Sequence, residues 1–253
     1  MEAWLQEMEV LFNRHGFSAG QRDAVQYTMQ GDATLRLDPV GQEQSVDCGI
    51  AYDAHFMAFP PRSDVAVLSS PYGRAVETFD ICRPYIHSAI LLPVQARAYL
   101  GEQRYGGVNG LGPDQIAEQY PDFLPTQKAF AAHGERYLLK FPGVDSEGVR
   151  GESQYDVYIR TKAIIGDLYD LYQSGIRHVI VNSHGTSGRA AQMNVLGMPC
   201  SDEVWRNWPK PNNCQIDRIF KGERTVLYPG APEPASSRIS RPQNLPSIGN
   251  GTQ

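Results

Sequence analysis

The sequence predicts an α/β fold, in the form of a three-layer α/β/α sandwich with a mostly parallel central sheet. Short apolar runs of strand length alternate with longer segments of helical pattern, which is the rhythm of parallel strands connected by helices. The four clearest runs are Val10–Phe12, Val65–Leu68, Ile90–Val94 and His178–Val181. We therefore expect these runs to be buried strands flanked by helices.

Two segments have the pattern of long helices. In residues 153–173, apolar side chains return at helical spacing along one face, and Gly175 is placed to end the helix. A second helix is predicted to begin after Asp38, with Asp38 as the N-cap and Pro39 in the first turn, and to continue to about Phe56.

The other segments complete a single domain, residues 1–229. Residues 214–220 and 224–228 are predicted to form a hairpin at the sheet edge, because a short turn with glycine separates two strand-like runs. Residues 112–151 are interrupted by prolines, which indicates a lid-like insertion over the carboxyl end of the strands. Residues 230–253 are rich in Pro, Ser, Gly and Asn, and are predicted to be a flexible tail.

Composition excludes several classes of partner. The chain has 23 basic and 28 acidic residues, a net charge of -5, and no basic run that would follow a nucleic-acid backbone. No apolar stretch approaches the ~20 residues of a membrane helix, and the acidic N-terminus has no signal-peptide core. We expect a cytoplasmic protein that binds neither nucleic acid nor membrane. Its four cysteines lack zinc spacing and are expected to be reduced, mostly buried thiols.

Cationic or ionisable side chains directly follow three of the apolar runs. They are Arg14 and His15 after the first run, Arg74 after the second, and His184 after the fourth. Taken singly, a strand-end histidine is more often structural and an arginine is more often a solvated ion-pair partner. However, the carboxyl ends of strands in an open α/β sheet meet at the ligand site. The joint placement therefore predicts one anion-binding site.

Six segments together carry a family resemblance. They are Arg14-His15-Gly16 and the segments 37–44, 69–78, 102–111, 151–153 and 183–185. In this order, they resemble the histidine phosphatase superfamily, also called phosphoglycerate mutase-like, over nearly the whole chain from about residue 10 to 228. The resemblance implies a metal-independent phosphoryl-transfer enzyme that needs no cofactor.

The resemblance also implies roles for individual residues. His15 would be phosphorylated during turnover, and Arg14, Arg74 and His184 would surround the transferred phosphoryl group. Glu102 would be the proton donor, and Tyr105 would help to hold the substrate. The residue types suit this chemistry, because an imidazole must be neutral to attack phosphorus and nearby arginines lower its pKa.

This chain departs from the family pattern after the signature. Phe17 replaces an acid, and Gln21 replaces an asparagine; Gln21 either donates to the phosphate or is a plain surface residue. Thr186 either contributes its backbone N–H or hydroxyl to the phosphate or caps the next helix, and capping is the favoured interpretation. The mutases' arginine pair has no counterpart before Gly151, where Lys128 and Arg136 are isolated cations.

Hydrolysis of a small phosphomonoester is therefore the predicted reaction. Without the arginine pair, water rather than a second substrate oxygen should accept the phosphoryl group from His15. Two alternatives stay open: a phosphoglycerate mutase-like phosphotransferase, and a catalytically weak phosphate-ligand binding module. Sugar phosphates, phosphoacids and nucleotides all fit as substrates, and the oligomeric state is left open.

Overall fold

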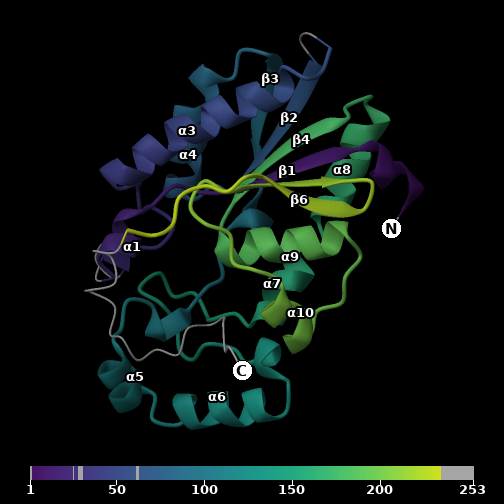
Figure 1. Ribbon diagram of the computed structural model, residues 1–253. Helices are drawn as coiled ribbons and strands as arrows, with labels where there is room; N and C mark the ends of the chain where they lie inside the picture. Colours follow the sequence, from purple (N-terminus) through teal and green to yellow (C-terminus); the bar gives the residue numbers. More distant parts are fainter. Residues whose placement is uncertain (1, 25, 28–30, 61–62, 235–253) are drawn as a thin grey trace.

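The computed structural model describes residues 2–24, 26–27, 31–60 and 63–234. Within these residues, six strands form one sheet in the order β3-β2-β4-β1-β5-β6 (Figure 1). The β3-β2, β2-β4 and β4-β1 pairs are parallel, and the β1-β5 and β5-β6 pairs are antiparallel. The strands are β1 (Glu9–Arg14), β2 (Ser63–Ser69), β3 (Ala89–Ala96), β4 (His178–Ser183), β5 (Ile216–Phe220) and β6 (Glu223–Tyr228).

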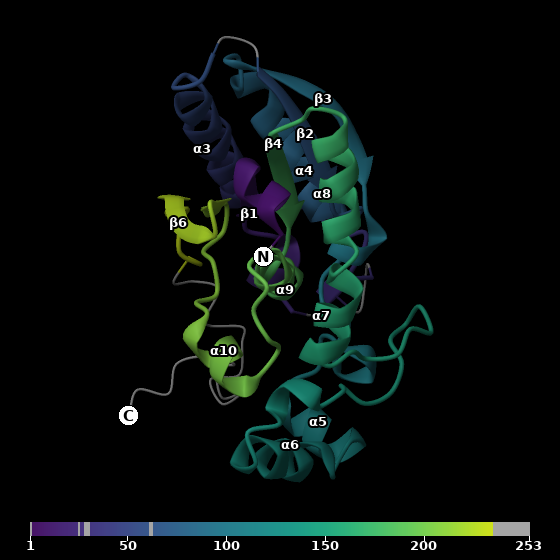
Figure 2. The same cartoon turned by 90° about the vertical axis from the view of Figure 1, so that its right-hand side faces the viewer.

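Helices cover both faces of the sheet, so the predicted three-layer sandwich is confirmed (Figures 1 and 2). Because side chains alternate along a strand, β1 sends Val10 and Phe12 into one core and Leu11 into the other. The main covering helices are α3 (Pro39–Phe56) and α4 (Gly73–Cys82) on one face, and α8 (Ile164–Gln173) and α9 (Gly185–Val195) on the other.

Shorter elements connect these layers. The α-helices are α1 (Ala19–Arg22), α5 (Pro113–Gln119), α6 (Phe123–Ala132), α7 (Gln154–Thr161) and α10 (Asp202–Asn207). The 3-10 turns are η1 (Ala3–Glu7), η2 (Arg83–Tyr85), η3 (Ala98–Leu100), η4 (Gly106–Val108) and η5 (Arg136–Leu138).

Most element predictions are confirmed. Each of the four apolar runs lies inside a strand of the sheet. Helix α3 begins at Pro39, and the side chain of Asp38 accepts a hydrogen bond from the backbone N–H of Val40 at 3.0 Å, as an N-cap does. The hairpin at the sheet edge is β5 and β6, joined through Lys221 and Gly222, both at positive φ.

The predicted helix over 153–173 is wrong in one respect: it is two helices. Helix α7 ends at Thr161 and α8 begins at Ile164, although no glycine or proline marks the break. The two helices pack on different cores. Val157 of α7 packs in the cluster that contains Trp205, whereas Ile164 and Leu168 of α8 pack against the sheet. Gly175, at φ +86°, follows the end of α8 as expected.

The insertion lies beyond the carboxyl ends of the parallel strands, where α5 and α6 form the lower part of the molecule in Figure 2. It shares a small apolar core with the segment that precedes it, in which Ile116, Phe123 and Phe141 of the insertion pack with Tyr105. We call residues 112–151 the lid.

A line of polar side chains crosses three strands inside the sheet. Asn13 of β1 donates to the Oδ1 of Asn182 of β4 at 2.9 Å, and Asn182 donates to the Oγ of Ser69 of β2 at 3.0 Å. The Tyr52 hydroxyl donates to the other end, the Oδ1 of Asn13, at 3.0 Å. These buried groups satisfy one another, so the line carries no desolvation penalty for an unpaired polar atom.

The remaining expectations concern the tail, the cysteines and the membrane. Residues 235–253 of the predicted tail lie outside the described residues. In the described part, Ala231 and Asn213 exchange two backbone hydrogen bonds, so the chain is still held there. All four cysteines are free thiols, and three of them are buried. Among the described residues, no helix is both long and apolar enough to span a bilayer.

Candidate active site

His15 directly follows β1 and is 4% exposed. Its Nδ1 lies 2.7 Å from the carbonyl oxygen of Gly16, which can only accept, so Nδ1 carries the proton of this hydrogen bond. On the other side of the ring, the Nε of Arg74 donates to Nε2 across 3.3 Å. The neutral ring therefore has its lone pair on Nε2.

The surroundings also keep the histidines neutral. Burial, followed by the charges of Arg74 and Arg14, holds the pKa of His15 well below its ordinary value. The arginines act in the expected direction, but burial is the larger cause. Burial and Arg74 likewise lower the pKa of His184. A neutral imidazole keeps a lone pair that can attack phosphorus.

Two buried guanidinium groups flank His15. Arg74, in the first turn of α4, lies with its Nη1 2.8 Å from the Oδ1 of Asp32 and donates to the Asp32 carbonyl oxygen at 2.6 Å. Arg14, at the end of β1, donates to the carbonyl oxygen of Pro211 at 2.9 Å and to the Oε1 of Glu233 at 3.2 Å. The Nε of Arg14 is buried and has no hydrogen-bond partner in the described part of the chain.

His184 directly follows β4, and its ring centroid lies 5.0 Å from that of His15. Its Nε2 is 2.8 Å from the Oγ of Ser70, which accepts the backbone N–H of Tyr72 at 3.2 Å. We infer that the Ser70 hydroxyl donates to Nε2, which leaves the proton of His184 on Nδ1. This Nδ1 is buried without a partner among the described residues, so it is a donor available to a ligand.

Glu102 lies at the amino end of α9. Its Oε1 accepts three backbone N–H groups, from Gln103 at 2.9 Å, Thr186 at 3.1 Å and Ser187 at 3.2 Å. A helix amino terminus favours a negative group, because its N–H groups point outward without partners. The carboxylate is thus held in one place, near the strand end that carries His184.

The glycines after the two histidines have different environments. A Cβ on Gly16 would lie 2.4 Å from the carbonyl oxygen of Gly41, because the His15 loop packs directly on the first turn of α3. A Cβ on Gly185 would meet three charged side chains at 3.4 to 3.8 Å, those of Lys210, Glu102 and Arg14. Of these two glycines, Gly185 is therefore the one that borders the charged site.

Gln21 is not a surface residue, and that interpretation is wrong. The side chain is 4% exposed, and its Nε2 donates to the Oε1 of Glu233 at 3.0 Å and to the Oδ1 of Asn213 at 3.2 Å. The amide also closes the capping box of α1 with Ser18. Gln21 and Arg14 thus donate to the same carboxylate oxygen.

The capping interpretation of Thr186 is wrong, whereas the contact of its hydroxyl with the phosphate stays a prediction. The N-cap of α9 is His184, so Thr186 lies inside the first turn and does not cap it. Its backbone N–H donates to Glu102.

Tyr105, the expected substrate contact, packs on the lid with its ring centroid 4.8 Å from that of Phe141. Burial and the charge of Glu102 raise the pKa of the Tyr105 hydroxyl.

Sequence reasoning missed five residues of this site: Ser70, Asp32, Lys210, Asn213 and Glu233. Asn213 donates to the carbonyl oxygen of His15 at 3.0 Å, and the Nζ of Lys210 lies 3.6 Å from the Oε1 of Glu233. Ser70 had a signal, because it lies in the segment that carries Arg74. The other four are in loops without periodicity, where their positions depend on the folded chain.

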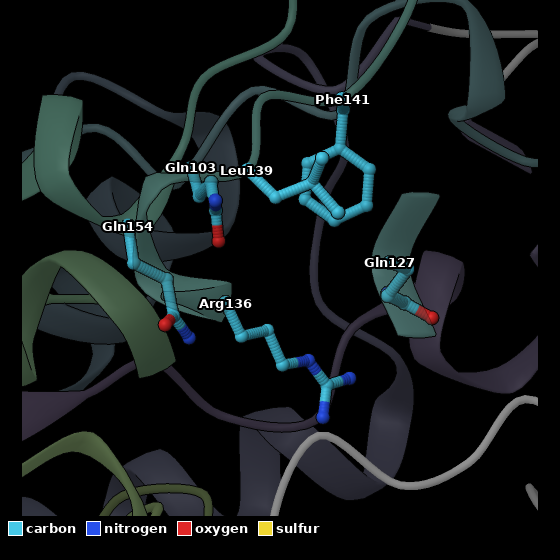
Figure 3. A pocket seen from close by; sticks show the side chains of 6 residues that line it. All are labelled: Gln103, Gln127, Arg136, Leu139, Phe141 and Gln154. Atoms are coloured by element: carbon cyan, nitrogen blue, oxygen red, sulfur yellow. The ribbon is translucent and has the colours of Figure 1, made fainter. Parts of the chain in front are cut away.

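A small cavity has Gln103, the residue after Glu102 in the sequence, in its wall. It is lined by Gln103, Gln127, Arg136, Leu139, Phe141 and Gln154 (Figure 3). In Figure 3 the side chain of Arg136 runs from the side of Gln154 toward the side of Gln127. Its Nη2 is buried and has no hydrogen-bond partner in the described part of the chain. The cavity therefore offers one cation and several amide groups to a ligand.

Comparison with known proteins identifies the family of this site. The sequence profile of the histidine phosphatase superfamily (branch 1) matches residues 10–226. The chain belongs to the histidine phosphatase superfamily. The match contains every strand of the described sheet except the ends of β1 and β6, and it contains His15, Arg74, Glu102 and His184.

Individual histidine phosphatase relatives are distant. The phosphoglycerate mutase-like protein AT74 of Arabidopsis thaliana is 24% identical over 225 residues, which are 85% of this chain and 65% of that protein. The chain thus spans about two thirds of the length of this relative.

Solved structures of the superfamily share the fold. The mycobacterial glucosyl-3-phosphoglycerate phosphatase has a TM-score of 0.59 and 19% identity, with 88% of this chain and 100% of that chain covered. The phosphoglycerate mutase of Bacillus anthracis has a TM-score of 0.58 and 19% identity, with 87% and 91% covered. The superfamily includes phosphatases and mutases, so membership supports an enzyme of the histidine phosphatase type.

Proposed function

We propose that the protein is a metal-independent phosphatase that hydrolyses a small phosphomonoester through a phosphohistidine on His15. The observation that carries this proposal is the state of the His15 ring. Its proton is on Nδ1, its lone pair is on Nε2, and burial with two arginines keeps it neutral. A buried imidazole in this state is a nucleophile facing an anion-binding site.

In the first step, the Nε2 lone pair of His15 attacks phosphorus and the bond from phosphorus to the ester oxygen breaks. Arg14, Arg74 and the Nδ1–H of His184 donate to the equatorial oxygens, whose charge must be stabilised in the transition state. Glu102, in its protonated form, gives its proton to the departing alkoxide oxygen.

In the second step, water attacks the phosphorus of phospho-His15. Glu102, now ionised, accepts a proton from this water, the bond from phosphorus to Nε2 breaks, and inorganic phosphate leaves. The same carboxylate serves both steps, which is consistent with its fixed position on three amides at the edge of the site.

Water is the proposed acceptor because the lid offers little to hold a second substrate oxygen. Among the described residues that line the lid cavity, Arg136 is the one cation, whereas the mutase pattern has an arginine pair. We propose that the leaving-group end of the substrate lies on the side of the site where Arg136 is, and that it departs before water attacks.

The decisive experiment measures phosphate release from an aryl phosphate and a panel of phosphorylated metabolites, with a chelator present. We expect turnover that survives chelation and is lost in His15→Ala. The matched control is His87→Ala, since His87 is exposed and precedes β3 at the opposite end of the sheet.

Two results would contradict the proposal. Unchanged turnover in His15→Ala would exclude His15 as the nucleophile. Isomerised phosphoester without release of phosphate would identify a mutase. A direct readout is the intermediate itself: after a rapid quench in alkali, mass spectrometry should find one phosphoryl group on the peptide that contains His15.

A further inference from the structure

The Glu233 carboxylate occupies the anion-binding side of the candidate site. Its Oε1 accepts hydrogen bonds from the Nη2 of Arg14 at 3.2 Å and from the Nε2 of Gln21 at 3.0 Å, and it lies 3.6 Å from the Nζ of Lys210. Two cations and one amide thus converge on a single oxygen of the protein's own chain.

These donors suit a phosphoryl oxygen equally well. Arginine and lysine bind carboxylates and phosphates through the same N–H groups. Arg14 is 6% exposed, and Glu233 takes its Nη2, so a phosphate oxygen cannot bind that nitrogen while Glu233 is in place; among the described residues only the Nε of Arg14 is left as a donor. Arg74 is paired in the same way with Asp32 at 2.8 Å, so both guanidiniums of the site face internal carboxylates.

The backbone before Glu233 is tied to the site. Ala231 donates to the carbonyl oxygen of Asn213 at 2.9 Å and accepts the Asn213 N–H at 3.1 Å. The Asn213 side chain in turn donates to the carbonyl oxygen of His15. A carboxylate held two residues from this anchor acts at a high effective concentration, of order millimolar for a short tether.

We propose that Glu233 is an internal competitor for the phosphate site. In the free protein its carboxylate occupies the position on Arg14, Gln21 and Lys210 that a phosphoryl oxygen of the substrate takes. The inference rests on the proposed function for the identity of the ligand, and it adds Lys210 to the phosphate-binding groups.

Binding of substrate is then an exchange. A phosphate dianion carries more charge and more acceptor oxygens than a carboxylate, so it displaces Glu233 from the same donors. The apparent affinity for phosphate is reduced by the fraction of molecules in which Glu233 is withdrawn. A site that is open in about a tenth of the molecules would bind phosphate about tenfold more weakly than the open site.

The test is the affinity of the full chain for inorganic phosphate and for orthovanadate, measured by isothermal titration calorimetry. We expect Glu233→Gln and Glu233→Ala to bind both anions fivefold or more tightly than the parent. The matched control is Glu223→Gln, which removes the same charge at the exposed start of β6 and should leave the affinity unchanged. Lys210→Met in the Glu233→Ala background should weaken binding again.

Unchanged or weaker anion binding in both Glu233 variants would overturn the proposal, since the carboxylate would then be neutral or supportive for the ligand. Thermal unfolding of each variant shows that the fold is kept. Anion binding is measured without turnover, so this proposal and the proposed function can fail separately. Tighter binding in the Glu233 variants without hydrolysis by the parent would support Glu233 as a competitor and reject the phosphatase. Hydrolysis by the parent with unchanged affinity in the variants would support the phosphatase and reject the competitor.

Discussion

The Nε of Arg74 donates to the Nε2 of His15 across 3.3 Å, so the arginine binds the atom that the proposed mechanism uses as its nucleophile. In the absence of substrate this hydrogen bond protects the lone pair from protonation. A phosphoryl group that enters the site offers the same N–H a charged acceptor, and the lone pair is then released toward phosphorus.

Arg74→Lys is expected to lower kcat by a factor of about 100 to 1,000, the usual cost of a lost donor to transition-state charge. Lysine keeps the charge but loses the planar fork that reaches His15 and Asp32 together. Steady-state kinetics with an aryl phosphate measure the effect. Arg83→Lys, at an exposed position after the same helix, is the control and should retain parental activity.

Gly16→Ala and Gly185→Ala should separate stability from activity. At Gly16 the new methyl group meets a backbone carbonyl at 2.4 Å, so we expect a loss of about 1–3 kcal/mol from overpacking and a lower Tm. At Gly185 the contacts are ordinary, so Tm should hold while kcat/KM falls about tenfold or more, because the methyl group enters the charged site. Equal activity in Gly185→Ala and the parent would contradict this placement of the site.

Arg136→Ala should affect substrates according to their leaving group. A buried guanidinium nitrogen without a partner favours an anionic ligand. We expect KM for phosphoglycolate to rise about tenfold or more, since a hydrogen bond to a charged group is worth ~1.5–3 kcal/mol, while KM for ethyl phosphate stays the same. Lys128→Ala removes an exposed lid cation beside Gln127 as the control. An equal rise for both esters would argue against a carboxylate in the cavity.

Stability should fall as the pH drops from 7 to 5. His15 and His184 have lowered pKa values and stay neutral in the folded protein, whereas in the unfolded chain they bind protons below a pH of about 6.5. The unfolded state thus takes up more protons, and acid favours it. Each histidine contributes at most roughly 1.4 kcal/mol per pH unit in this window. Differential scanning calorimetry should show a shallower decline of Tm in His184→Gln.

The strands and the strand-end site residues follow from the sequence for a local reason. Apolar runs mark the buried strands, and the carboxyl ends of parallel strands meet at one edge, so His15, Arg74 and His184 can be grouped without coordinates. The break between α7 and α8 has no such signal. The apolar spacing continues through it, and only the packing shows that α7 and α8 contact different cores.

The loop residues of the site depend on the folded chain. Asp32, Lys210 and Glu233 reach the arginines and Gln21 from separate loops, and Glu233 comes from a segment whose composition predicts a detached tail. Gly16 shows the converse case. Gly16 belongs to the signature Arg14-His15-Gly16, but the contact that requires a glycine there is with the backbone of α3, which the sequence does not reveal.

The polar line through Asn13, Asn182 and Ser69 restricts which parts of the site can be altered by mutation. Each of the three lies just before a residue of the site. Asn13 precedes Arg14 and His15, Asn182 lies two residues before His184, and Ser69 precedes Ser70. Sliding any strand by one residue would break a buried hydrogen bond and turn its side chains to the opposite face. The three strand ends therefore behave as one rigid body, and new substrate ranges are more accessible through the lid than through the strands.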